Sequence, residues 1–199
     1  GRNSPATPSA FTTAPYFLQS GTDKSNKSSP DIAKMSTVNS HSLPHSCSKI
    51  MRLDEILIKE RARANVEGVS KKRVLESIAT LFAEQLDDVD VDELYRNLLN
   101  REKLGPTGIG GGIAIPHCRF NTQGRTYGAC LTLTTPIDFD AVDNEPVDII
   151  FAMLVPENAE SEHLQMLATL AEQLQAPSFV SRLRAANDDN ELFNATTSG

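Results

Sequence analysis

The sequence predicts one α/β domain, built on a mixed sheet of about five strands with helices packed on both faces. Three observations support this fold class. Apolar residues recur at helical spacing in several segments, other short apolar stretches have the character of strands, and the two kinds of segment alternate along the chain. The 199 residues are enough for one domain of ordinary size and a tail.

Residues 1–50 are predicted to be a disordered leader or tag, and residues 51–199 the folded domain. The first segment contains 21 Ser, Thr or Pro residues and almost no apolar periodicity, so it cannot bury enough surface to offset the entropy of ordering it. A targeting peptide is less favoured, because the segment has one Arg and no amphipathic helical pattern. His41, His45 and Cys47 lack a fourth ligand in this stretch, and we expect no metal site there.

Charge and cysteine content exclude several classes of protein. Residues 1–50 carry a net charge of +3 and residues 51–199 a net charge of −10. An acidic folded part argues against binding of nucleic acid, which needs clustered Lys and Arg. No apolar run approaches the roughly 18 residues that cross a bilayer, so we expect no membrane insertion. Three cysteines, odd in number and irregularly spaced, indicate a reducing, cytoplasmic location.

Two amphipathic helices are predicted in the first half of the folded part, each with a polar N-cap. Ser70 precedes the first apolar stripe. Asp90, with Glu93 three positions later, has the spacing of a capping box, and Gly105 ends this second helix. The apolar positions of the two stripes are Val74, Leu75, Ile78, Leu81, Phe82, Leu86, Leu94, Tyr95, Leu98 and Leu99.

The second half is predicted to contain three strands and two helices. The first strand follows a glycine-rich loop, the second alternates like a strand with one buried face, and the third is nearly continuously apolar, as in a central strand covered on both faces. Two helices follow, the second opened by a proline. In chain order, these elements are residues 113–115, 127–134, 147–155, about 161–175, and a shorter helix from Pro177.

Two histidines lie in the folded part, and both are candidates for chemistry. His117 follows a proline at the end of a short strand, and His163 lies in the first turn of the third helix. An imidazole near neutral pH is both a nucleophile and a leaving group, so it can accept a phosphoryl group and pass it on. The first turn of a helix favours anions, which suits His163 to a place beside that group.

Further groups could hold phosphate oxygens. Arg101, near the end of the second helix, carries a planar guanidinium suited to that role, although an ion pair with Glu102 or Asp92 is an alternative. A glycine-rich loop lets backbone N–H groups approach an anion without interference from side chains. The predicted phosphoryl-binding loop consists of Gly110, Gly111 and Gly112.

Three better-known phosphate motifs do not fit this sequence. A P-loop needs Gly-Lys-Ser/Thr after its spaced glycine, but Gly110 is followed by two more glycines, and a dinucleotide loop should follow a strand rather than a helix. The spacing from Cys118 to Arg125 is one residue too long for the nucleophile loop of a tyrosine phosphatase. Nucleotide-binding and thiol-phosphatase functions are therefore disfavoured.

The stretch NRE…GPTGIGGGIAIPH, followed 46 residues later by HLQMLATLAEQL, resembles the IIA domain of the fructose/mannitol class of the bacterial phosphotransferase system. The match is nearest to its free-standing nitrogen-regulatory branch, EIIA-Ntr, and runs over about residues 51–193. The resemblance implies that His117 is phosphorylated, at Nε2 of its ring, and that His163 and Arg101 stabilise the phosphoryl group. It implies no cofactor and no metal.

The resemblance also implies partners. The donor would be a small HPr-like phosphocarrier (NPr), charged from phosphoenolpyruvate by enzyme I-Ntr, and the targets would be proteins such as potassium transport systems or sensor kinases. Two other functions stay open. One is a fructose/mannitol-type IIA protein that passes phosphate to a IIB domain for sugar uptake, and the other is a binding module that has lost phosphoryl transfer.

Two positions depart from the family pattern. Gly111 stands where many members carry a polar or acidic residue that can orient the histidine, and Cys118 stands where glycine is usual. These departures leave His117 without that orienting group and predict either altered docking of the donor or a redox-sensitive thiol beside it.

Overall fold

The computed structural model describes residues 52–158 and 161–198, except the side chains of residues 161–164. The leader predicted for residues 1–50, with its His41, His45 and Cys47, lies outside the described residues. The elements are α1 (Leu53–Ile56), β1 (Leu57–Val66), α2 (Lys71–Ala83), α3 (Val91–Leu104), β2 (Gly108–Gly110), β3 (Ile113–Ala114), β4 (His117–Phe120), β5 (Tyr127–Ile137), β6 (Val147–Pro156), α4 (Ser161–Leu174), α5 (Pro177–Ala185) and α6 (Asp189–Thr197). In these ranges, every helix is too short or too polar to cross a bilayer.

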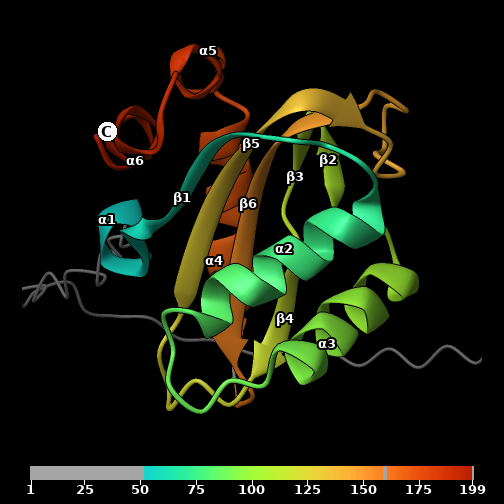
Figure 1. Cartoon of the computed structure of the whole chain (residues 1–199), viewed down its shortest axis with the longest axis vertical. Coiled ribbons are helices and arrows are strands. Elements are labelled where there is room, and N and C mark those ends of the chain that lie inside the picture. The colour runs from blue at the N-terminus through green and yellow to red at the C-terminus, as the bar shows by residue number, and fades with distance from the viewer. Residues whose placement is uncertain (1–51, 159–160, 199) are drawn as a thin grey trace, which may run out of the picture. The chain divides into compact units, whose positions relative to one another are not determined.

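A mixed sheet of six strands organises the fold (Figure 1). Five strands lie in the order β1-β5-β6-β3-β2, and β4 also pairs with β6. The central strand β6 is antiparallel to β5 on one edge and parallel to β3 and then β4 along the other. The predicted α/β class is therefore confirmed. Strand β2 comes from the glycine-rich stretch that we expected to be a loop.

Helices cover both faces of this sheet, as predicted. In Figure 1, α2 and α3 lie in front of the sheet and α4 lies behind it. One hydrophobic core, which includes Phe82 and Leu131, fills the space under α2 and α3. A second core, which includes Phe151 and Leu183, lies on the opposite face. The strands between the two cores are consequently shielded from water on both sides.

Local sequence signals set the ends of α2 and α3. The Ser70 hydroxyl accepts a hydrogen bond from the N–H of Arg73 at 3.3 Å, and the Asp90 carboxylate accepts one from the N–H of Glu93 at 2.7 Å. Gly105 is the C-cap residue of α3. The three predicted boundary residues are thus confirmed, and they determine which residues occupy the last turn of α3.

The prediction for residues 127–134 is wrong in one respect. The strand exists, but both of its faces are buried: Leu131 packs in the first core, whereas Cys130 packs in the second and is fully buried. Alternation of small or polar residues with large apolar ones looked like one exposed face. The small residue Gly128 instead leaves room for the ring of Phe151, which a Cβ at position 128 would approach to 3.1 Å.

The edge strand β1 carries charges that hid it from prediction. Arg61 interrupts its apolar pattern, yet this side chain is only 3% exposed. Its guanidinium donates to the carbonyl of Ile56 at 3.0 Å and lies over the ring of Tyr127, 5.1 Å from the centroid. A buried cation satisfied by a carbonyl and an aromatic face cannot be recognised from sequence spacing, and the last helix, α6, was likewise not predicted.

The N-cap of α3 provides a test of this architecture. We expect Asp90→Ala to lower the free energy of unfolding by about 1 kcal/mol, because the N–H of Glu93 loses its acceptor. The matched control is Asp92→Ala, which removes a carboxylate from the same first turn without removing the cap. Urea unfolding of the two variants measures the difference, and equal losses would contradict the capping role of Asp90.

Candidate functional site

His117 lies at a break between two short strands. β3 ends at Ala114 and β4 begins at His117. The histidine therefore starts a strand, whereas we predicted that it ends one. Pro116, between the two strands, accepts a hydrogen bond from the N–H of Met153 at 2.9 Å, which keeps the chain attached to β6. The break turns the imidazole toward α3 while its backbone remains in the sheet, and the ring is half-buried.

Two hydrogen bonds fix the ring and select one tautomer. Nδ1 of His117 lies 2.8 Å from the carbonyl oxygen of Ile115, and a carbonyl can only accept, so Nδ1 carries the proton. Nε2 lies 3.2 Å from Nε of Arg101, which can only donate, so Nε2 is the unprotonated nitrogen. The neutral ring therefore presents its lone pair at Nε2, next to a guanidinium.

The surroundings of His117 favour its neutral form. Burial lowers the pKa of His117 below its ordinary value, and the positive charge of Arg101 lowers that pKa further. The hydrogen bond with the Ile115 carbonyl and the negative charge of Glu102 act in the opposite direction. Since burial is the largest of these effects, the ring is unprotonated at neutral pH, as a nucleophile must be.

The structure brings Arg101 to His117, as predicted from the sequence. Its Nη1 donates to the carbonyl of Gly105 at 3.0 Å, which orients the guanidinium across the end of α3. The alternative ion pair with Glu102 is not formed, because Glu102 pairs with Lys71 at 3.0 Å. The other alternative partner, Asp92, is exposed in the first turn of the same helix.

Sequence reasoning missed Glu102 as a component of this site. The carboxylate is almost completely buried and accepts from both the N–H and the hydroxyl of Thr107, at 3.2 and 2.6 Å. A Glu beside an Arg in a helix rich in charge is normally solvent-exposed, so the pattern contained no signal of burial. Only the fold, which places Lys71 of α2 against this turn of α3, reveals its role.

The predicted phosphoryl-binding loop is not beside His117. Ile113 pairs with Ile149 of β6, whereas His117 pairs with Met153. Four residues of extended strand therefore separate the positions, a distance of about 13 Å. The turn formed by Gly110, Gly111 and Gly112 precedes Ile113 and lies farther away still.

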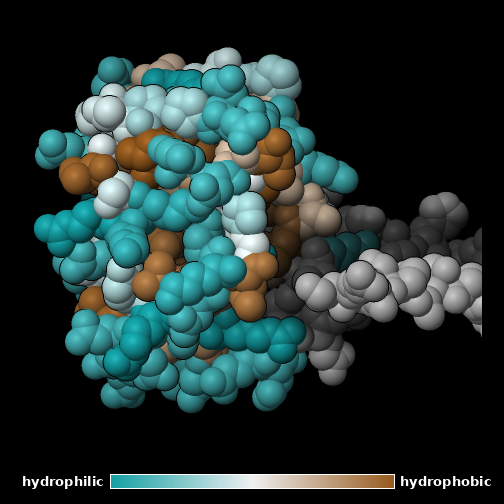
Figure 2. All heavy atoms as spheres, turned by 90° about the vertical axis from the view of Figure 1, so that its right-hand side faces the viewer, coloured by the Kyte–Doolittle hydropathy of each residue, from teal (hydrophilic) through white to brown (hydrophobic). Residues whose placement is uncertain are grey.

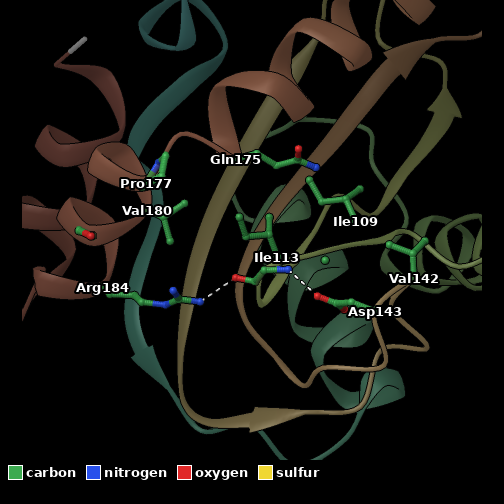
Figure 3. Close-up of a pocket in the computed structure, with 11 residues that line it drawn as sticks. Ile109, Ile113, Val142, Asp143, Gln175, Pro177, Val180 and Arg184 are labelled. Carbon is green, nitrogen blue, oxygen red and sulfur yellow. Dashed lines mark hydrogen bonds between the residues drawn. The ribbon is translucent and has the colours of Figure 1, made fainter.

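The backbone groups of this turn also have partners within the protein. The N–H of Gly111 donates to Asp143 at 2.8 Å, and its carbonyl accepts from Arg184 at 2.9 Å. Figure 3 shows these two side chains approaching from opposite sides of a cavity of about 530 Å³. Gly112 has a φ angle of +81°, a left-handed conformation that favours glycine at this position. The described contacts of the glycine motif are therefore with this part of the fold, at a distance from His117.

His163 lies in the first turn of α4, as predicted. Its side chain lies outside the described part of the structure. β6 ends at Pro156, three residues beyond the Met153 that pairs with His117, and α4 begins at Ser161. The chain therefore passes from the strand beside His117 to the helix that carries His163 within a few residues.

Cys118, for which the sequence allowed a redox-sensitive thiol, is buried. Its side chain is 5% exposed and packs in the core under α2 and α3. Burial raises the pKa of the Cys118 thiol to about 12. A thiol with this pKa is protonated at neutral pH, so neither redox sensitivity nor the nucleophile of a thiol phosphatase is supported.

An apolar residue is exposed beside the site. Leu104, the last residue of α3, is 87% exposed and directly precedes Gly105, whose carbonyl holds Arg101. Figure 2 views the side of the molecule on which α3 ends in Figure 1, and shows apolar patches separated by polar residues. Among the described residues, no group of three or more His, Cys, Asp or Glu side chains is placed to hold a metal ion.

Known proteins are similar to this chain in sequence and in fold. The family model for the "phosphoenolpyruvate-dependent sugar phosphotransferase system, EIIA 2" matches residues 55–198. The chain is 47% identical over 144 residues to a "nitrogen regulatory protein" of Pseudomonas aeruginosa, covering 72% of this chain and 94% of that protein. A similarly named protein of Escherichia coli is 43% identical over 148 residues, covering 74% and 90%. The crystal structure of nitrogen regulatory protein IIA-Ntr from Neisseria meningitidis superimposes with a TM-score of 0.64 at 36% identity, covering 72% and 97%.

The environment of His117 predicts its titration. We expect the ring to titrate below its ordinary value of 6.5, and Arg101→Met to raise the pKa because a neighbouring positive charge is removed. As pH falls below 6.5, the unfolded chain binds a proton before the folded one does. The contribution of this ring to stability is therefore lost between 6.5 and the lower pKa of the folded state. NMR titration measures the pKa, and Arg96→Met, on an exposed position of α3, is the matched control.

The burial of Cys118 predicts its reactivity. In a Cys47→Ser background, we expect Cys118 and Cys130 to resist alkylation by iodoacetamide at pH 8, because both are buried with pKa values of about 12. The same protein unfolded in urea should react at both thiols. Mass spectrometry of the alkylated peptides distinguishes the sites, and rapid labelling of Cys118 in the folded protein would contradict this assignment.

Proposed function

The chain belongs to the EIIA 2 family of the phosphoenolpyruvate-dependent sugar phosphotransferase system, as a nitrogen-regulatory IIA protein, and we propose that His117 is its phosphoryl acceptor. The alternative of a IIA protein for sugar uptake is not favoured, because the most similar curated proteins are nitrogen regulatory proteins. We base this proposal on the geometry of the His117 imidazole.

The observation that supports this proposal is the placement of the Nε2 lone pair. The carbonyl of Ile115 holds the proton on Nδ1, so the ring does not have to change tautomer before it reacts. Arg101 lies at the reactive nitrogen, where its positive charge would meet an incoming phosphoryl group. Positioning and charge neutralisation are the main requirements of phosphoryl transfer, and both are met here.

In the proposed step, Nε2 of neutral His117 attacks the phosphorus of a phosphohistidine on the donor, in line with the bond that breaks. A new N–P bond forms, and the electron pair of the old N–P bond returns to the ring nitrogen of the donor. The proton on Nδ1 of His117 stays in its hydrogen bond with Ile115 throughout. No metal or nucleotide takes part in this step.

We assign the stabilisation of the transferred group to Arg101 and His163. The Arg101 guanidinium is held by the carbonyl of Gly105 and donates to Nε2 of His117. Once the N–P bond forms, it would donate to the phosphoryl oxygens instead. Support for His163 comes from its place in the first turn of α4, where backbone N–H groups and the helix dipole favour an anion. The glycine turn at residues 110–112 has no part in this step.

The proposed donor is a small HPr-like phosphocarrier (NPr) that is charged from phosphoenolpyruvate by enzyme I-Ntr. The exposed Leu104 offers such a carrier an apolar contact next to the site. Phosphorylation adds about two negative charges beside Arg101, and so changes the surface that partners contact. We propose that this change controls binding to targets such as potassium transport systems or sensor kinases. The proposed relay is cytoplasmic, since the unpaired Cys118 and Cys130 suit a reducing compartment.

Phosphorylation in vitro tests this assignment. Incubation with phosphoenolpyruvate, enzyme I-Ntr and the HPr-like carrier should give one acid-labile, base-stable phosphoryl group on His117, and none on His117→Gln. Arg101→Met should lower the transfer rate by about 10²-fold, as removal of one preorganised donor does elsewhere. His163→Ala should lower the rate without abolishing it.

The controls separate chemistry from folding. Arg96→Met removes an equal charge from an exposed position of α3 and should transfer at the normal rate. Circular dichroism shows whether each variant remains folded. Phosphorylation that persists in His117→Gln, or its absence in the wild-type protein, would overturn the proposal.

A further inference from the structure

We infer that Glu102 is a positioning residue for His117, and that it acts by clamping the turn that connects α3 to β2. This inference rests on the proposed function of His117. The turn consists of Gly105, Pro106 and Thr107, and neither Glu102 nor this turn touches the reactive nitrogen Nε2 in the described contacts. The effect of Glu102 on the imidazole is therefore transmitted through the backbone.

The carboxylate grips the end of this turn at two points. Oε1 accepts from the N–H of Thr107 at 3.2 Å, and Oε2 accepts from the Thr107 hydroxyl at 2.6 Å. Both side chains are buried, at 8% exposure for Glu102 and 5% for Thr107. Two bonds to one residue restrain its orientation as well as its distance.

The clamped turn binds both residues that contact the imidazole of His117. Its first residue, Gly105, accepts from Nη1 of Arg101 at 3.0 Å. Its last residue, Thr107, accepts from the N–H of Ile115 at 2.9 Å. The carbonyl of Ile115 in turn holds Nδ1 of His117 at 2.8 Å. One carboxylate thus restrains both of the groups that contact the imidazole.

A buried carboxylate is costly unless it is paired, and here Lys71 provides the pairing. Its Nζ lies 3.0 Å from Oε1 of Glu102 and 2.6 Å from the exposed Asp140. The same ammonium lies over the ring of Phe139, 4.8 Å from the centroid. A hydrophobic pair could fill such a space with no loss of stability, so a buried ion pair is weak evidence for a stabilising role. Its bonds to Thr107 favour a role in orientation.

Charge provides a second connection between Glu102 and the ring. The negative charge of Glu102 raises the pKa of His117, whereas Arg101 and burial lower it. Glu102, and not a residue at position 111, is the acidic group connected to the ring in this structure. The acidic residue that the family pattern suggests at Gly111 would lie at the far turn, near Asp143 and Arg184, and not beside His117.

The test uses Glu102→Gln, which keeps the size of the side chain and removes its charge. We expect the rate of transfer to His117 to fall by about tenfold, which corresponds to a loss of about 1.4 kcal/mol of transition-state stabilisation. We also expect the His117 pKa to fall, and ¹⁵N NMR of its ring to show a smaller fraction of the Nδ1–H tautomer. Loss of the charge lowers the pKa by itself, whereas a purely structural role would leave the tautomer unchanged, so the tautomer is the discriminating measurement.

Two further variants isolate the clamp. Thr107→Val removes the hydroxyl and should give the same change of tautomer, whereas Thr107→Ser keeps the hydroxyl and should resemble the wild type. Asp140→Asn, the matched control, removes the exposed partner of Lys71 without touching Glu102, and should leave the ring unchanged.

The outcomes are distinguishable from failure of the proposed function. An unchanged rate and an unchanged tautomer in Glu102→Gln would overturn the positioning role even if His117 is phosphorylated. If the wild-type protein is not phosphorylated at all, the proposed function fails, while the NMR measurements still decide whether Glu102 orients the ring. If Glu102→Gln does not fold, the comparison of Thr107→Val with Thr107→Ser decides the question.

Discussion

The hydrogen bond between Nδ1 of His117 and the carbonyl of Ile115 is the interaction on which the site depends. It determines where the ring carries its proton, and therefore which nitrogen can react. The bond exists because Pro116 interrupts the chain between β3 and β4, so that a backbone carbonyl two residues before the histidine is not used by the sheet. A small irregularity along one edge of β6 thus leaves Nε2 of His117 as the unprotonated ring nitrogen.

Two opposite charges influence this half-buried ring, one by direct contact and one from a distance. Arg101 reaches Nε2 directly, and Glu102, the next residue in the same helix, contacts the turn that follows. Consecutive residues of a helix project about 100° apart, which lets one face the site and the other face the core. The charge of Glu102 is compensated by Lys71. The charge of Arg101 is therefore available to an anion at Nε2, as we propose.

The glycine turn lies at a distance from His117, although we expected it to lie beside the phosphoryl group. Gly110, Gly111 and Gly112 have φ angles of +93°, +65° and +81°, a left-handed geometry that glycine adopts at low cost. This geometry, with no Cβ in the way, admits Asp143 and Arg184 and closes the hairpin between β2 and β3. The glycines were expected to bind a phosphoryl group, but the N–H and carbonyl of Gly111 bind side chains of the protein, and the carbonyl of Gly112 accepts from the backbone of β6.

The pairing of His117 with Arg101 was expected from the resemblance to a known family. The sequence by itself determined the fold class, the caps at Ser70 and Asp90, and the end of α3 at Gly105. These features depend on periodicity and on local hydrogen bonds between near neighbours, which a sequence displays directly. Tertiary structure alone decided that Glu102 and Cys118 are buried, and that the glycine turn lies more than four strand residues from His117. The reason is that burial and register depend on which segments meet across the sheet, and those contacts join residues that are distant in the chain.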